Sequence, residues 1–113
     1  MIATFYLPIL ECVRETGTSG ISSEGLRRQM ITKLGNQLSE SERSRLVSPS
    51  RQRTKGNYFE WALADLVTYK CLSKHDDRYL LTEEGNHLLS YIARNPGTRL
   101  SRGFLRQPVG LRG

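Results

Sequence analysis

The sequence predicts a mostly helical domain that carries one small β-hairpin. Three observations lead to this prediction. Apolar residues recur with helical spacing in several stretches, two short apolar runs flank a turn-forming tetrapeptide at 75–78, and clusters of Gly, Pro, Ser or Asn separate these stretches. A chain of 113 residues has room for one core. The elements are therefore expected to pack into one domain.

The first helix is predicted by an apolar face and by the residues at its ends. Thr4 is the candidate N-cap, and Pro8 is tolerated because the first turn of a helix has no intrahelical N–H bonds to lose. The glycines at 17 and 20 end this helix. Its apolar face follows the i, i+3, i+4, i+7 spacing and consists of Tyr6, Ile9, Leu10 and Val13.

A second helix follows Ile21, a single extended apolar residue. Ser22 and Ser23 are its candidate N-caps, and it ends at the Gly35-Asn36 pair. Its apolar side chains are Leu26, Met30, Ile31 and Leu34.

A short third helix begins with a capping box. The Ser39 hydroxyl and the Glu42 carboxylate can each satisfy a free backbone N–H of the first turn. The helix ends at Ser48-Pro49, and a polar connector over 50–57 leads into the most apolar helix, predicted over 58–70. A stripe this rich usually packs in a core. It consists of Phe59, Ala62, Leu66 and Tyr69, widened by Trp61 and Leu63.

The apolar period changes from helical to alternating after residue 70. Residues 71–74 and 79–82 are predicted to form a hairpin around 75–78, with Tyr79 and Leu81 pointing inward and Leu80 outward. Thr82 then caps a last helix, which has two acidic residues in its first turn and ends at Asn95-Pro96. Its inner face consists of Gly85, Leu88, Leu89 and Ile92.

Short helices followed by a two-stranded hairpin are typical of a winged helix-turn-helix. We expect this domain to cover residues 1–95. Residues 96–113 contain four glycines and two prolines without an apolar period, and they are predicted to be a basic, linker-like tail.

The positive charge of the chain favours an acidic partner, and its composition argues against a membrane-spanning or disulfide-rich protein. The net charge is +6, and the composition is that of a folded cytosolic protein without a disulfide framework or a membrane span. The cations Arg51, Arg53 and Lys55 have no acidic residue near them between Glu42 and Glu60. The arginines after residue 84 lie in or near the tail, where a solvated surface is the simpler interpretation.

This basic segment predicts an interface with double-stranded DNA. In a helix-turn-helix, residues near the start of the second helix reach base edges in the major groove. Arg51, Arg53 and Lys55 are expected to bind the phosphate backbone, although an arginine can also pair with guanine. Gln52, Asn57 and Tyr58 are the candidates for base contact.

The hairpin adds two further candidates, Lys74 and Arg78, which flank its turn. Asp76 and Asp77 at the same tip would repel phosphates. Arg27 and Arg28 on the second helix could touch the backbone, but solvated surface is the expected role for both.

Several short motifs of the chain, and the order in which they follow one another, resemble the N-terminal domain of Mrr-type restriction endonucleases. The resemblance covers nearly the whole chain. The family often has an arginine and a small residue just before the Trp-Ala pair, where this chain has Tyr58, Phe59 and Glu60, and it usually has a glycine at the position of Cys71. The matching segments are Ser48 to Arg51, Asn57, Trp61-Ala62, Leu66, Lys70 to Leu72, Leu81 to Gly85, Asn95-Pro96 and Phe104 to Pro108.

The resemblance implies a prokaryotic, cytoplasmic DNA-binding module of a restriction system. Its partners would be double-stranded DNA and a nuclease domain or subunit. The family's metal-dependent nuclease is a separate domain for which this chain has no room, so a fragment, a truncated product and a stand-alone module all stay open.

No catalytic constellation is found in the sequence. His75, His87, Cys12 and Cys71 each lack a partner at a catalytic spacing, and no nucleotide-binding or hydrolase motif occurs. We therefore expect no enzyme activity, no metal site and no cofactor. Two alternatives to DNA binding in a restriction system stay open. One is a module for dimerisation or protein contact, with Tyr91 and Leu80 at its surface, and the other is a transcriptional regulator.

Overall fold

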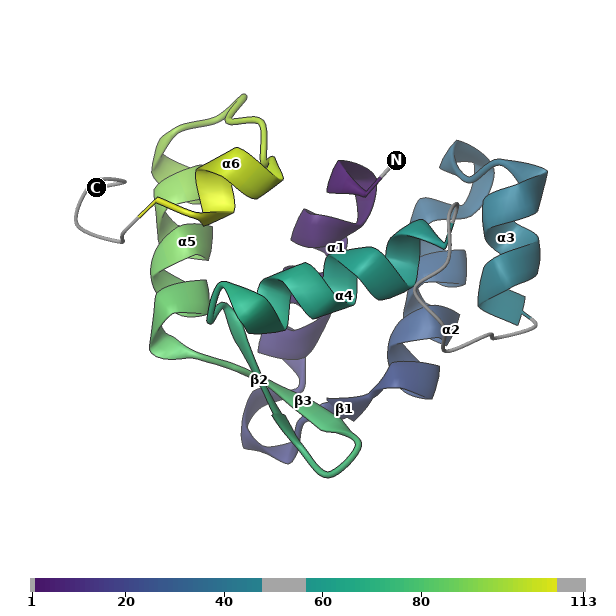
Figure 1. The fold of residues 1–113 in the computed structure, drawn as a ribbon, viewed down its shortest axis with the longest axis horizontal. Helices are drawn as coiled ribbons and strands as arrows, with labels where there is room; N and C mark the ends of the chain where they lie inside the picture. The colour runs from purple at the N-terminus through teal and green to yellow at the C-terminus, as the bar shows by residue number, and fades with distance from the viewer. Residues whose placement is uncertain (1, 48–56, 108–113) are drawn as a thin grey trace.

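A computed structural model describes residues 2–47 and 57–107 of the chain. Within these ranges the fold is mostly helical, with a small three-stranded antiparallel sheet (Figure 1). This confirms the predicted helices and hairpin and adds a third strand. The elements are α1 (Ala3–Glu15), η1 (Gly17–Ser19), β1 (Ile21–Ser22), α2 (Ser23–Leu34), η2 (Gly35–Gln37), α3 (Glu40–Val47), α4 (Tyr58–Thr68), β2 (Leu72–His75), β3 (Arg78–Leu81), α5 (Glu83–Arg94) and α6 (Arg102–Leu105).

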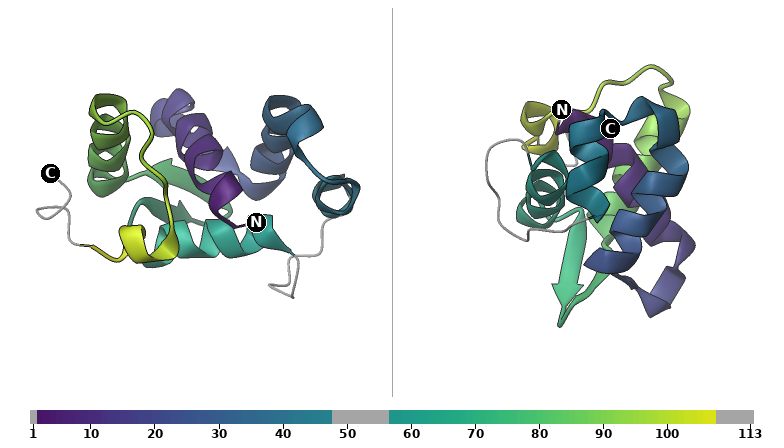
Figure 2. Two further views of the ribbon diagram at one scale, coloured as in Figure 1. Left: turned by 90° about the horizontal axis from the view of Figure 1, so that it is seen from above. Right: turned by 90° about the vertical axis from the view of Figure 1, so that its right-hand side faces the viewer.

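Helix α1 is the centre of the core, because it packs against α2, α4, α5 and β3. Figure 2 shows α4 and α6 along one side of the molecule and α5, α1 and α2 behind them. The predicted apolar stripes of these helices supply most of the core. Its largest fully buried side chains are Phe5, Tyr6, Ile9, Leu10, Leu26, Met30, Leu66, Leu72, Leu88 and Leu105.

The start of α1 differs from the prediction. Ile2, and not Thr4, is the N-cap residue, and the Phe5 N–H donates to the Ile2 carbonyl at 3.1 Å. Phe5 is buried edge-on against Phe59, with ring centroids 5.8 Å apart. Helix α1 therefore begins about half a turn earlier than predicted, where Phe5 packs on Phe59. As a result, Pro8 lies inside the helix and not in its first turn.

Three of the predicted caps are confirmed by hydrogen bonds. The Ser22 hydroxyl accepts from the Gly25 N–H at 3.1 Å, and the Thr82 hydroxyl accepts from the Gly85 N–H at 3.0 Å. In the capping box, the Glu42 N–H donates to the Ser39 hydroxyl at 3.1 Å and the Ser39 N–H donates to the Glu42 carboxylate at 3.0 Å. These bonds involve residues three apart, which is why the sequence alone could predict them.

The sheet has the strand order β1-β3-β2. Ile21 is therefore paired, opposite Tyr79 of β3, and is not an isolated extended residue. The strands of the hairpin are shifted by one residue from the prediction, and its turn contains Asp76 with a positive φ of 57°. Tyr79 is buried as predicted, but Leu80 is half-buried against Gly20 and does not point freely outward.

Helix α4 ends two residues earlier than predicted, in a Schellman motif. The Cys71 N–H donates to the Leu66 carbonyl at 2.8 Å, and the Lys70 N–H donates to the Val67 carbonyl at 3.1 Å. Lys70 occupies the left-handed position with a φ of 66°, where glycine is usually found. The chain then turns directly into β2.

Replacing Lys70 by Gly is expected to raise the free energy of unfolding by about 0.5–1 kcal/mol, because glycine adopts a positive φ without steric cost. Urea denaturation followed by circular dichroism measures this change. The matched control is Lys70→Ala, which removes the same charge but keeps the Cβ and should not stabilise the protein. A Lys70→Gly variant no more stable than Lys70→Ala would contradict the assigned backbone strain.

Residues 96–107 contain more structure than a linker-like segment implies. Helix α6 begins at a cap in which the Ser101 hydroxyl accepts from the Phe104 N–H at 3.1 Å, and Leu105 is buried. The division of the chain at residue 95 stays a prediction. Within the described ranges, no helix is long and apolar enough to cross a bilayer.

Candidate nucleic-acid interface

Four of the eight predicted interface residues can be placed in the structure. Asn57 and Tyr58 lie at the start of α4, while Lys74 and Arg78 lie on the hairpin. The other four, Arg51, Gln52, Arg53 and Lys55, lie outside the described residues. The sequence nevertheless fixes that these four lie just before the first turn of α4.

Asn57 and Tyr58 do not fit the predicted role in base contact. Asn57 is only 3% exposed, and its carbonyl accepts from the Trp61 N–H at 3.2 Å. Tyr58 is half-buried beside Ile2, Tyr6 and Arg102, on the side of α4 that faces α1 and α6. Neither residue lines the hollow between α4 and the hairpin.

The two hairpin cations have different surroundings. The Lys74 ammonium lies 5.6 Å from the centroid of the Tyr79 ring and lines the hollow next to α4. The Arg78 guanidinium instead donates to the Gly20 carbonyl at 3.1 Å, which ties the hairpin to η1. Lys74 is thus the hairpin cation beside α4, and Arg78 has a structural contact as well as a charge.

The arginines of α2 also differ from each other. Arg28 is exposed and pairs with Glu24, as expected for a solvated residue. Arg27 is only 5% exposed, and its guanidinium donates to the Ser23 hydroxyl at 3.4 Å, so the prediction of a solvated Arg27 was wrong.

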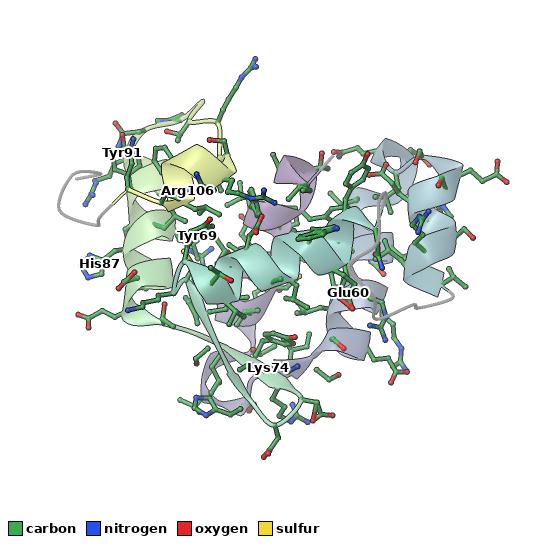
Figure 3. The ribbon with its side chains drawn as sticks, viewed as in Figure 1. Glu60, Tyr69, Lys74, His87, Tyr91 and Arg106 are labelled. Atoms are coloured by element: carbon green, nitrogen blue, oxygen red, sulfur yellow. The ribbon has the colours of Figure 1, made fainter. Side chains whose placement is uncertain are left out.

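A hollow of about 360 Å³ lies between α4, the hairpin and the start of α2. Figure 3 shows Glu60 extending from α4 on the side of the hairpin, where Lys74 lies. The hollow contains the carboxylates of Glu60 and Asp77 and the ammonium of Lys74. The remaining lining residues are Ser23, Leu63, Ala64, Val67, Thr68 and Tyr79.

The residues of α4 in this hollow were not among the predicted site residues. Glu60, Ala64 and Thr68 recur at i, i+4 and i+8, which places them on one face of the helix. This spacing is visible in the sequence. However, the adjoining apolar stripe gave no indication of which flank of α4 would face the hairpin.

The opposite side of α4 is held by a buried polar cluster. The Tyr6 hydroxyl donates to Asp65 Oδ2 at 2.6 Å, and Arg102 Nε donates to the same oxygen at 3.2 Å. Burial and the bond to Asp65 raise the pKa of Tyr6 well above its ordinary value, and the bond to Asp65 raises that of Arg102. The cluster connects α1, α4 and α6 on the side of α4 away from the hollow.

A second contact joins the end of α4 to the residues after α6. Arg106 Nε donates to the Tyr69 hydroxyl at 3.0 Å, and its guanidinium lies 5.9 Å from the centroid of the Tyr69 ring (Figure 3). Tyr91 of α5 packs against Phe104, with ring centroids 5.8 Å apart. The segment over 101–107 therefore lies along α4 and α5.

The remaining candidate reactive residues lie apart from this surface. Cys12 and Cys71 are both buried and are not joined in a disulfide, and burial raises the pKa of the Cys12 thiol. His75 is in an exposed part of β2, while His87 lies on α5 with its Nε2 3.8 Å from Glu83. Among the described residues, no group of His, Cys, Asp and Glu side chains is arranged to hold a metal ion.

Comparisons of this chain with family models, curated proteins and solved structures found no match.

Proposed function

We propose that this chain is a winged helix-turn-helix module that binds duplex DNA, with α4 as the helix that enters the major groove. The observation that carries the proposal is the order along the chain, in which the basic residues over 51–55 directly precede α4 and the hairpin that bears Lys74 follows it. The element order and the strand order β1-β3-β2 support a winged helix, because that fold has a short strand after its first helix and a hairpin after its recognition helix.

The dimensions of α4 suit this role. Its 11 residues give a length of about 16 Å, somewhat more than the roughly 12 Å width of the major groove. The cations that precede α4 in the sequence, such as Lys55, and Lys74 on the hairpin after it would then meet phosphates on either side of the groove. The positive end of the helix dipole adds to the attraction at the end that follows Lys55.

We further propose that the module serves a restriction system, in which it positions DNA for a nuclease. The resemblance of its motifs to Mrr-type N-terminal domains supports this role. In this proposal the chain acts by binding and not by catalysis. A transcriptional regulator could have the same fold, so the neighbouring genes decide between the two roles: a nuclease or methyltransferase gene beside this one would favour restriction.

The proposal predicts salt-dependent binding that depends on the basic segment. Fluorescence anisotropy should show a slope of log K against log salt of about −3 to −5, as expected for three to six phosphate contacts. Changing Arg51, Arg53 and Lys55 together to Ala should make this slope about three units shallower and weaken binding to all sequences alike.

The matched control changes Arg94, Arg99 and Arg112 to Ala, which removes the same charge from the C-terminal part of the chain. This control should bind nearly as tightly as the unchanged protein. Equal losses in the two triple variants would show that only net charge matters. Absence of binding to any duplex at low salt would refute the proposed function.

One observation favours protein contact as a second candidate function. Helix α4 contains no Lys or Arg, and the hollow beside it has two carboxylates and one ammonium. The predicted contact residues Tyr91 and Leu80 do not support this candidate, because both are half-buried against the chain itself. Sedimentation at micromolar concentrations tests self-association, and a monomer throughout would count against dimerisation.

A further inference from the structure

We propose that Glu60 reads a cytosine in the major groove by accepting a hydrogen bond from its N4 amino group. This inference rests on the proposed binding of duplex DNA and adds a base preference to it. It concerns the hairpin-facing side of α4, defined by Glu60, Ala64 and Thr68, which all line the hollow between this helix and the hairpin.

The position of Glu60 suits base contact. It is the third residue of α4, and residues in the first turns of a recognition helix are those that reach base edges. Ala64, one turn further along the same face, has no atoms beyond its Cβ that would hold α4 away from the bases. The carboxylate also borders the hollow of about 360 Å³, which leaves space for a base edge between α4 and the hairpin.

The chemistry of α4 excludes the most frequent base contact and favours a different one. No Lys or Arg occurs between Lys55 and Lys70, so α4 itself cannot pair with the two acceptors of guanine. An ionised carboxylate can only accept hydrogen bonds. In the major groove, cytosine offers the N4 donor, whereas adenine places the N7 acceptor next to its N6 donor.

Repulsion makes the carboxylate selective. Guanine O6 and N7 and thymine O4 are acceptors, so each would face Glu60 without a hydrogen bond and at an electrostatic cost. Lys74 lines the same hollow as Glu60, and its positive charge offsets part of the cost of a carboxylate near the DNA backbone. Affinity would therefore come from the cations and preference from Glu60.

Selection from a random duplex pool, followed by sequencing of the bound fraction, tests the inference with the full chain. The unchanged protein should enrich one position in which cytosine is preferred about tenfold, within the range for a good base contact. Glu60→Gln should lose this preference or shift it to adenine, because an amide side chain can pair with adenine N6 and N7.

The matched control is Glu83→Gln, which changes the net charge equally at an exposed position on α5. It should keep the cytosine preference. Both variants are first compared with the unchanged protein by circular dichroism, since Glu60 also has contacts within the protein. A second variant, Ala64→Leu, should reduce the preference by holding α4 away from the bases.

The possible outcomes separate the inference from the proposed function. If Glu60→Gln and Ala64→Leu both enrich the same sequences as the unchanged protein, the inference is wrong while DNA binding stands. The same conclusion follows if Glu83→Gln changes the preference as much as Glu60→Gln does. If the unchanged protein binds no duplex at low salt, both the proposed function and the inference fail.

Discussion

Replacing Gly85 by Ala is expected to lower the free energy of unfolding by about 3 kcal/mol or more. Gly85 lies in the first turn of α5, where the helix passes close to Cys71, between α4 and β2, and to Leu81 of β3. A Cβ at this position would lie 2.2 Å from the Cys71 carbonyl oxygen and 2.7 Å from Leu81 Cδ1. The carbonyl belongs to the backbone, so α5 would have to move away from the sheet, at a cost at or above the usual range for overpacking.

The matched control is Gly103→Ala in α6. Among the described residues outside the backbone of α6, a Cβ there would approach the Ser101 hydroxyl at 3.8 Å, an ordinary contact, so this change should alter stability by less than about 1 kcal/mol. Urea denaturation followed by circular dichroism measures both variants. A Gly85→Ala variant as stable as Gly103→Ala would show that α5 does not approach Cys71 this closely.

Replacing Asp65 by Ala is expected to destabilise the protein by about 2–4 kcal/mol. Asp65 is 8% exposed and is the acceptor for both the Tyr6 hydroxyl and the Arg102 side chain. Without it, the Tyr6 hydroxyl is left buried with its hydrogen bond to Asp65 lost, which costs its full desolvation. Arg102 is partly exposed and can turn to water, so its share of the loss is smaller.

A double-mutant cycle with Tyr6→Phe isolates the bond between Tyr6 and Asp65. Removing both groups leaves no unpaired hydroxyl, so the double variant should be at least about 1 kcal/mol more stable than the sum of the single effects predicts. Asp77→Ala, at an exposed position of the hairpin turn, is the control and should change stability by less than about 0.5 kcal/mol. Strictly additive effects of Tyr6→Phe and Asp65→Ala would contradict the buried bond.

Comparison of Asp65→Ala with Glu60→Gln also separates the contribution of α4 to stability from its proposed role in base contact. Asp65 lies on the side of α4 away from the hairpin, so Asp65→Ala should release the segment over 101–107 without changing the groove-facing residues. Glu60→Gln changes the opposite face. Stability and base preference are therefore expected to respond to different variants of the same helix.

Much of the fold could be predicted because it depends on short-range patterns. The caps at Ser22, Ser39 and Thr82 each involve a residue three positions away. The turn composition of 75–78 indicated the hairpin. The exceptions have tertiary causes: the packing of Phe5 on Phe59 accompanies the earlier start of α1, and the pairing with Tyr79 turns Ile21 into part of a strand.

The candidate site was less predictable, because exposure depends on what covers a residue. Asn57 and Arg27 are polar and were expected at the surface, yet both are buried. Tyr58 and Glu60 are two residues apart, and helical geometry places them on different sides of α4. Only the positions of α1 and the hairpin decide which of these sides is open.

The sequence by itself determined the helices, the hairpin and the excess of positive charge, since these follow from apolar spacing, caps and composition. Only the tertiary structure decided which face of α4 is open and that residues 102–106 return to this helix. Those features depend on contacts between distant residues, such as Tyr6 with Asp65 and Asp65 with Arg102. No local pattern encodes such a contact, because each partner has an ordinary environment until the chain has folded.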